Sequence, residues 1–110
     1  MATNLSLGEL EQVLLLAILQ LGDEAYTVPI SRLLADRVGR QVSRGAVYTS
    51  LDRLETKGLV TSTMGEPLTE RGGRARRYFT VTSRGLRALR TARAALLTLS
   101  AGLESLLESK

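Results

Sequence analysis

The sequence of 110 residues contains no cysteine, no histidine and no tryptophan. Without cysteine, the chain can form no disulfide and has neither a thiol nucleophile nor a thiolate ligand for a metal. Without histidine, it lacks the most frequent general base and the most frequent metal ligand. These absences exclude nucleophile–histidine catalysis and zinc sites, and leave only carboxylate, lysine or tyrosine chemistry open. We therefore expect no enzyme activity and no cofactor or metal.

The sequence also lacks the features of an exported or membrane-spanning protein. It has no run of about 18 apolar residues, which is what a membrane-spanning helix requires. The first residues, Met-Ala-Thr-Asn-Leu-Ser, have neither the basic region nor the apolar stretch of a signal peptide. The absence of cysteine fits a reducing compartment. These features predict a cytoplasmic protein with no membrane association and a single hydrophobic core.

Positive charge is concentrated in the middle of the chain. The net charge is +4, but residues 40–93 hold twelve basic and four acidic residues, whereas both flanking parts are net negative. Eight arginines and no acidic residue lie between Arg71 and Arg93. The planar guanidinium of arginine suits bidentate contacts with phosphate. A run of charge often does no more than solvate a surface, but this excess of arginine favours binding to a polyanion.

The segment from Ser43 to Gly58 has the pattern of a helix with one buried face and one polar face. Ser43 can cap the first turn, and Gly58 can end the helix in the left-handed conformation. Between them, Val47, Leu51 and Leu54 recur at helical spacing and predict a stripe that faces the core. The opposite face carries Gly45, Thr49, Asp52 and Thr56, flanked by Tyr48 and Arg53.

This polar face has two interpretations. It belongs either to an ordinary amphipathic helix at the surface or to a helix that enters a DNA major groove. The basic residues that follow it in the sequence favour the second interpretation.

Two helices are expected before this segment. The apolar spacing predicts a first helix over residues 6–21, with Ser6 and Glu9 as a capping box, and a second over residues 27–38, with Thr27 as the cap. The first helix is apolar on more than one side. It therefore lies either in the centre of the core or beside a second subunit.

A β-hairpin is expected after the segment. Alternating β-branched residues predict strands over residues 59–64 and 76–82. The connection between them is rich in glycine and arginine and longer than a hairpin needs, which indicates a device for contact with a partner.

The last helix is expected to begin at Thr82 or Ser83 and to run unbroken to about Leu107. Such a helix would be about 37 Å long, which is more than a domain of this size can cover. A 3-4 spacing of apolar residues favours dimerisation over a helix that folds back on its own core. The residues with this spacing are Leu89, Ala92, Leu96, Leu99, Leu103 and Leu106.

The order of these elements is that of a winged helix-turn-helix. The expected fold class is therefore mainly α with a small β-hairpin (α+β), in which a long C-terminal helix mediates dimerisation. We expect a DNA-binding domain over residues 1–82 and a dimerisation helix over residues 83–110, which together form one structural unit.

Three stretches of the sequence resemble the PadR family of bacterial transcriptional regulators. The first is Gly8-Glu-Leu-Glu with the apolar run from Val13, followed by Asp23-Glu-Ala-Tyr. The second is the Tyr…Leu…Leu-Glu…Gly-Leu pattern that begins at Tyr48. The third runs from Arg74 to Gly85. The match covers about residues 5–95, and the single last helix is similar to that of the short branch of the family.

The resemblance implies a homodimer built from the first and last helices, which usually acts as a repressor. Several family members respond to small hydrophobic compounds, so the resemblance also implies an effector of that kind. The sequence departs from the family at Thr49, where many relatives have proline. Because threonine can donate to and accept from base edges, this change would alter base preference without altering the fold.

Two sets of candidate residues follow. Thr49 and Asp52 are the candidates for reading bases, and Asp52 would either accept from a cytosine amino group or pair with Arg53 or Arg44. The predicted DNA-binding residues are Ser43, Arg44, Tyr48, Thr49, Asp52, Arg53, Arg71, Arg74, Arg76 and Arg77. The predicted dimerisation residues are Leu14, Ile18, Leu89, Leu96, Leu99, Leu103 and Leu106.

We therefore predict a transcriptional regulator, a repressor, that binds an inverted repeat in double-stranded DNA as a homodimer and is released by a small hydrophobic ligand. The alternative is a winged-helix module that binds protein or RNA, because a fold does not determine a function. A protein-binding module would have an apolar outer helix face and an uncharged wing, and an RNA-binding module would expose aromatic side chains. The first pattern is the reverse of what this sequence shows, and Tyr48 alone gives the second little support.

Overall fold

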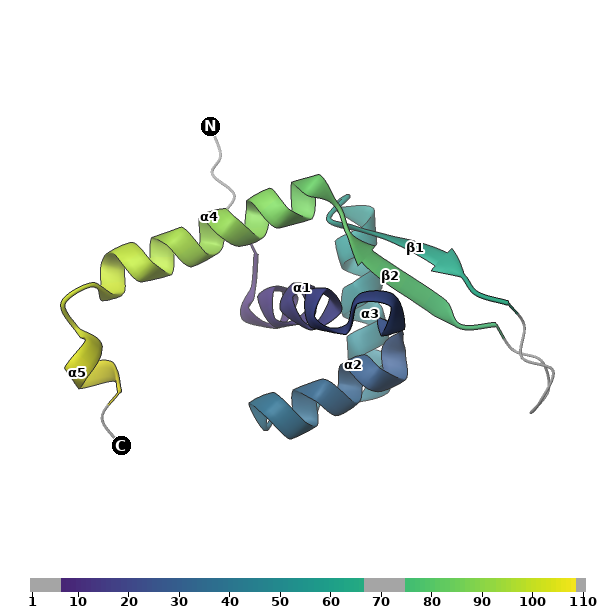
Figure 1. Ribbon diagram of the computed structural model, residues 1–110, viewed down its shortest axis with the longest axis horizontal. Helices are drawn as coiled ribbons and strands as arrows, with labels where there is room; N and C mark the ends of the chain where they lie inside the picture. Colours follow the sequence, from purple (N-terminus) through teal and green to yellow (C-terminus); the bar gives the residue numbers. More distant parts are fainter. Residues whose placement is uncertain (1–6, 67–74, 109–110) are drawn as a thin grey trace.

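A computed structural model of the chain describes residues 7–66 and 75–108. The predicted fold class is confirmed, because the described residues form mainly helices and one small antiparallel hairpin (Figure 1). Within the described residues, no helix combines the length and apolar character needed to cross a bilayer. The elements are α1 (Glu9–Leu21), η1 (Gly22–Glu24), α2 (Thr27–Leu33), η2 (Leu34–Val38), α3 (Arg44–Thr56), β1 (Val60–Met64), β2 (Arg77–Val81), α4 (Ser83–Ser100) and α5 (Glu104–Leu107).

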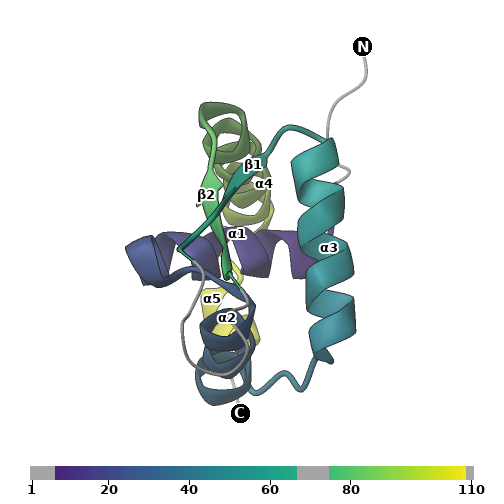
Figure 2. The ribbon, with the colours of Figure 1, turned by 90° about the vertical axis from the view of Figure 1, so that its right-hand side faces the viewer.

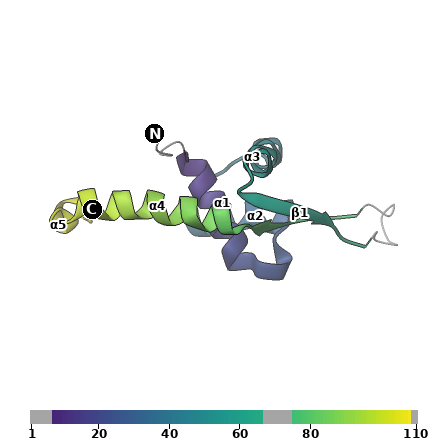
Figure 3. The same cartoon turned by 90° about the horizontal axis from the view of Figure 1, so that it is seen from above.

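Helix α1 lies at the centre of the molecule. It contacts α2, α3, α4 and β2 (Figure 1). The hairpin and α4 extend from this body in opposite directions, which is clearest from above (Figure 3). Figure 2 shows that one long side of α3 faces away from the other elements. The fold therefore presents α3 and the hairpin on the outside, each held by the same central helix.

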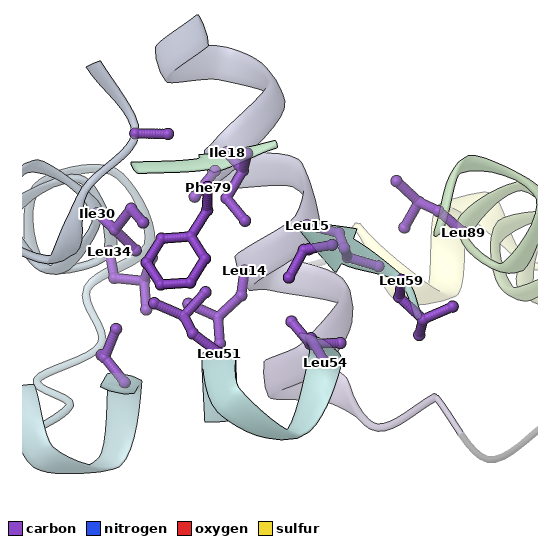
Figure 4. Packing of buried hydrophobic residues seen from close by; sticks show 14 of the residues in the cluster. Leu14, Leu15, Ile18, Ile30, Leu34, Leu51, Leu54, Leu59, Phe79 and Leu89 are labelled. Carbon is purple, nitrogen blue, oxygen red and sulfur yellow. The ribbon is translucent and has the colours of Figure 1, made fainter. Parts of the chain in front are cut away.

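The core forms where α1 meets its neighbours. Leu14, Leu15 and Ile18 of α1 belong to one buried cluster with residues of every surrounding helix and of β2 (Figure 4). Neighbours in the same chain therefore cover much of the apolar surface of α1, whereas Leu16 and Leu19 remain exposed. The other labelled members of the cluster are Ile30, Leu34, Leu51, Leu54, Leu59, Phe79 and Leu89.

The first two helices begin at different residues from those predicted. The proposed cap Ser6 lies outside the described residues. Helix α1 is capped at Gly8, whose backbone N–H donates to the Glu11 carboxylate at 3.0 Å. Thr27 is already helical, and the cap of α2 is Tyr26, whose extended backbone accepts the first helical hydrogen bond from Ile30. Glu11 can accept the hydrogen bond from Gly8 because it stands three residues after this cap, where its side chain reaches back to the backbone N–H.

The predicted signals at both ends of α3 are confirmed. The hydroxyl of Ser43 accepts from the backbone N–H of Ala46 at 3.1 Å. Gly58 has a φ of 78°, which glycine adopts without the steric cost of a side chain. The chain then enters β1, which pairs antiparallel with β2 so that Val60 lies opposite Val81 and Met64 opposite Arg77. Both strands are slightly shorter than predicted.

The last helix is not continuous, and its predicted run to Leu107 is wrong. Helix α4 ends at Ser100, Ala101 is extended, and Gly102 takes a φ of 87° before α5 begins at Glu104. Glycine at this position adopts the left-handed conformation easily, so the helix ends there. Leu103 and Leu106 therefore do not continue the apolar stripe of α4, although both are exposed.

Gly85, in the first turn of α4, lies close to Leu59, the residue before β1, and to Val81 of β2. A Cβ atom at this position would lie 2.2 Å from the carbonyl oxygen of Leu59 and 2.8 Å from Cγ1 of Val81. Because a backbone oxygen cannot rotate away, Gly85→Ala must push α4 away from Leu59. We expect the free energy of unfolding to fall by about 1–3 kcal/mol, measured by urea denaturation.

Gly45→Ala is the matched control for this prediction. No atom lies within 4 Å of the position that its Cβ would occupy. Alanine is also the better helix former, so the stability of this variant should equal or exceed that of the wild type. A similar loss of stability in both variants would contradict the role assigned to the contact at Gly85.

Candidate nucleic-acid interface

Helix α3 presents the polar face that its sequence predicted. Val47, Leu51 and Leu54 are fully buried and anchor the helix to the core. The opposite side is open to solvent (Figure 2). Its exposed residues are Arg44, Gly45, Tyr48, Thr49, Asp52, Arg53 and Thr56, and the cap Ser43 is exposed beside them.

Arg77 of β2 joins this face of α3 to the hairpin. One guanidinium nitrogen, Nη1, lies 2.6 Å from the Tyr48 hydroxyl and 2.9 Å from Oδ1 of Asp52. The other, Nη2, donates to the carboxylate of Glu55. Nε donates to the hydroxyl of Ser62 on β1 at 3.1 Å, and that hydroxyl donates in turn to Glu55. We call these five residues, Tyr48, Asp52, Glu55, Ser62 and Arg77, the Arg77 cluster.

Hydrogen bonds within the Arg77 cluster favour its charged forms. The Ser62 hydroxyl, and after it the Arg77 guanidinium, lower the pKa of the Glu55 carboxyl below its ordinary value. Burial by itself lowers the pKa of Arg77, but the carboxylates of Glu55 and Asp52 outweigh burial and raise that pKa. The cluster therefore holds a fixed cation between two anions.

The partner of Asp52 differs from the predicted ones. Its carboxylate pairs with Arg77, and not with Arg53 or Arg44. The reason is tertiary, because the hairpin packs against α3 through β1 and brings the Arg77 side chain of β2 within reach of Asp52. Glu55 and Ser62 were missed as members of this cluster. Their only sequence signals were the glutamate of the Leu-Glu pattern and a polar position within a strand.

The connection end of the hairpin carries an aromatic and cationic stack. The guanidinium of Arg76 lies 4.4 Å from the ring centroid of Tyr26, and this ring meets Tyr78 edge to face at 5.3 Å. Arg76 is exposed, so its guanidinium can bind a polyanion while one face of it packs on the Tyr26 ring. The predicted residues Arg71 and Arg74 lie outside the described residues.

A second ion pair connects α1 to the end of α3. The ammonium of Lys57 donates to the Glu11 carboxylate at 2.8 Å. Burial raises the pKa of Glu11, but the hydrogen bonds from Lys57 and from the Gly8 backbone N–H outweigh it and lower the pKa. This pair was not predicted, since the two residues are 46 positions apart.

The predicted dimerisation residues fall into two groups. Leu14, Ile18 and Leu89 are buried in the core of a single chain, so their assignment to a subunit interface is corrected: their neighbours lie in the same chain. The other four residues expose large parts of their side chains, from 44% at Leu103 to 79% at Leu99. These four are Leu96, Leu99, Leu103 and Leu106.

The lowered pKa of Glu11 predicts a stability that depends on pH. A carboxyl whose pKa is lower in the folded state stabilises the fold above its unfolded pKa, and this contribution disappears as the pH falls through the folded value. We expect Glu11→Gln to lower the free energy of unfolding by about 1–3 kcal/mol at pH 7. The difference from the wild type should shrink between about pH 5 and pH 3.

Urea denaturation at several pH values measures this difference. Glu9→Gln is the control, because the Glu9 carboxylate is 80% exposed in its ion pair with Arg40 and should contribute little to stability. A wild-type advantage over Glu11→Gln that stayed constant down to pH 3 would contradict the predicted linkage.

Comparison with known proteins adds independent information. Residues 15–91 match the model of the "Transcriptional regulator PadR-like family". No curated protein sequence matches the chain. The family match covers most of α1, the whole of α2, α3 and the hairpin, and the first half of α4. It therefore includes every element that forms the candidate interface.

Solved structures of regulators agree with the family match. A PadR family transcriptional regulator from Eggerthella lenta DSM 2243 shares 32% identity with a TM-score of 0.64, over 90% of this chain and 84% of that one. A PadR-like regulator from Bacillus cereus strain ATCC 14579 shares 26% identity with a TM-score of 0.70, over 92% of this chain and 93% of that one. A PadR family regulator from Clostridium difficile R20291 shares 23% identity over 87% of this chain and 96% of that one, and at a TM-score of 0.68 it has the same fold.

Proposed function

This chain belongs to the PadR-like family of transcriptional regulators, and we propose that it represses transcription by binding an inverted-repeat DNA site as a homodimer. Members of this family are DNA-binding regulators and not enzymes. A repressor of this kind acts by occupying DNA that the transcription machinery needs. Two copies related by a two-fold axis would present two α3 helices, so the DNA site would have the same symmetry.

The observation that carries the proposal is the polar, solvent-facing side of α3 on a helix whose other side is fully buried. A major groove admits one α-helix, and a helix anchored in the core can enter it without rearrangement. Exposed Arg44 and Arg53 stand at the edges of this side, where phosphates would flank the helix.

We assign roles by the chemistry of each side chain. Thr49 is the candidate for reading a base edge, because its hydroxyl can donate and accept and its methyl group can meet thymine. Arg76, with Arg71 and Arg74 of the hairpin connection, would contact the backbone or a narrow minor groove. The proposed phosphate contacts of α3 are Ser43, Arg44, Tyr48 and Arg53. If about four of these side chains in each subunit neutralise a phosphate, the plot of log affinity against log salt concentration should have a slope of about −7.

Selection of bound sequences from a random pool of DNA duplexes tests this function. We expect the wild type to select an inverted repeat whose half-sites are about one helical turn apart. Thr49→Ala should change the preferred base at one position of each half-site, and weaken binding to the wild-type site by roughly 1–3 kcal/mol.

Thr91→Ala is the control for Thr49, since Thr91 is also exposed but lies on α4. It should select the same sequences as the wild type. If the wild type selected no sequence at low salt, the proposed function would be wrong. If Thr49→Ala weakened every sequence equally, only the base-reading role would be lost.

The homodimer is supported by leucines that α4 and α5 leave uncovered. Helix α4 projects beyond the body of the protein (Figure 1), and Leu96, Leu97 and Leu99 in its second half are each more than half exposed. Leu106 and Leu107 of α5 are exposed as well. An accumulation of exposed large apolar side chains favours association with a partner.

Leu99→Asp should therefore separate the subunits. Placing a charge in an apolar interface costs several kcal/mol, so sedimentation at micromolar concentration should shift from dimer to monomer. Ala94→Asp is the control, since exposed Ala94 is on the opposite side of α4 from Leu99 by helical spacing. Monomeric wild-type protein, or dimeric Leu99→Asp protein, would contradict the proposed interface.

We also propose that a small hydrophobic effector binds the protein. A groove of about 250 Å³ lies between α1 and the α2–η2 helix and is lined mainly by apolar side chains. Exposed Leu16 and Val38 contribute to it. Ligand sites are usually concave and mostly apolar with few polar groups, as this groove is. An apolar compound bound beside α1 would act on the helix that supports both α3 and α4.

A further inference from the structure

We propose that Arg77 is a positioning residue that holds the recognition helix α3 against the hairpin, and that Asp52 anchors Arg77 and does not read bases. This proposal rests on the proposed function, because it assumes that α3 is the helix that meets DNA. It changes the roles of two residues that the sequence assigned to direct DNA contact.

The guanidinium of Arg77 binds three side chains of α3. Its partners on α3 are Tyr48, Asp52 and Glu55, which follow one another at spacings of four and three residues and so share one side of the helix. One side chain from β2 therefore spans two turns of α3. The Arg77 side chain is only 22% exposed, which leaves little of it for phosphate.

The second support is the connection to both strands. The Nε of Arg77 donates to Ser62 on β1, and the guanidinium lies 5.0 Å from the ring centroid of buried Phe79 on its own strand. Arg77 lies opposite Met64, the last residue of β1 before the connection. Arg77 thus ties the connection end of the paired strands to α3, in addition to the packing of Phe79 in the core.

The third support is the charge of the helix face. Asp52 and Glu55 lie on or beside the face of α3 proposed to approach phosphates, where an unpaired carboxylate would be repelled. Arg77 lies within ion-pair distance of both. Asp52 already accepts from Arg77 at 2.9 Å in the absence of DNA. To read a cytosine, Asp52 would have to break its ion pair with Arg77. Among the described residues, the Thr49 hydroxyl makes no such side-chain interaction.

A double-mutant cycle on the DNA-free protein tests the anchoring. The melting temperatures of the wild type, Asp52→Asn, Arg77→Gln and the double variant are compared at one protein concentration. We expect Arg77→Gln to lower the melting temperature by roughly 4–8 °C, the size of shift that loss of a modest interaction causes in a small domain. The double variant should lose clearly less than the sum of the single losses, since both changes remove the same contact.

Asp36→Asn is the control in this cycle, because exposed Asp36 lies on η2, outside the Arg77 cluster. Its effect should add to that of Arg77→Gln. Additive losses for Asp52 and Arg77 as well would overturn the proposal. This measurement needs no DNA, so its outcome does not depend on the proposed function.

Selection from random DNA tests the second half of the proposal. Asp52→Asn should select the same bases as the wild type, whereas a base reader would show a changed preference at one position of each half-site. Arg77→Gln should lower the affinity for all duplexes alike. Asp52→Asn should raise the affinity more when it is added to Arg77→Gln than when it is made in the wild type, because the Asp52 carboxylate has no cationic partner once Arg77 is replaced. A shifted base preference in Asp52→Asn, or an equal gain in both backgrounds, would overturn the proposal. A wild type that selects nothing would instead refute the proposed function.

Discussion

The burial of α1 is the constraint on which the other elements depend. Leu14 and Leu15 are completely buried, and the cluster around them includes residues of α2, η2, α3, β2 and α4. A two-stranded hairpin is marginal by itself in water, and so is an isolated helix the length of α3. Each becomes stable by covering part of α1. The relative positions of α3, the hairpin and α4 are therefore set by one shared surface.

Polar contacts complete the positioning that this core begins. The core holds the buried side of α3, but it cannot fix the outer side. There, among the described residues, the Arg77 cluster contains the only ion pairs between α3 and the hairpin. Lys57 and Glu11 attach the C-terminal end of the helix to α1. The orientation of α3 is thus fixed on both its buried and its outer side.

The proposed dimer contacts would leave the proposed interface to DNA free. Helix α4 leaves the body on the side away from the hairpin (Figure 3), so the exposed leucines of its second half are distant from the polar face of α3. Its first turn is held tightly by the contact of Gly85 with Leu59. A change at the proposed subunit interface would therefore reach α3 through α4 and α1, which are both parts of the same packed core.

Local signals in the sequence were sufficient for what depends on neighbouring residues. The cap at Ser43, the left-handed Gly58, the stripe of Val47, Leu51 and Leu54 and the pairing of two short strands all follow from spacing and backbone preference. The same reasoning missed the break at Gly102, because leucine spacing alone gave no weight to a glycine near the end of a helix. The assignment of Leu14, Ile18 and Leu89 to a subunit interface failed because periodicity shows that a face is apolar and does not show what covers it. The partners of Asp52 and Glu11 lie 25 and 46 positions away, and only the packing of strands and helices around α1 brought these charges together.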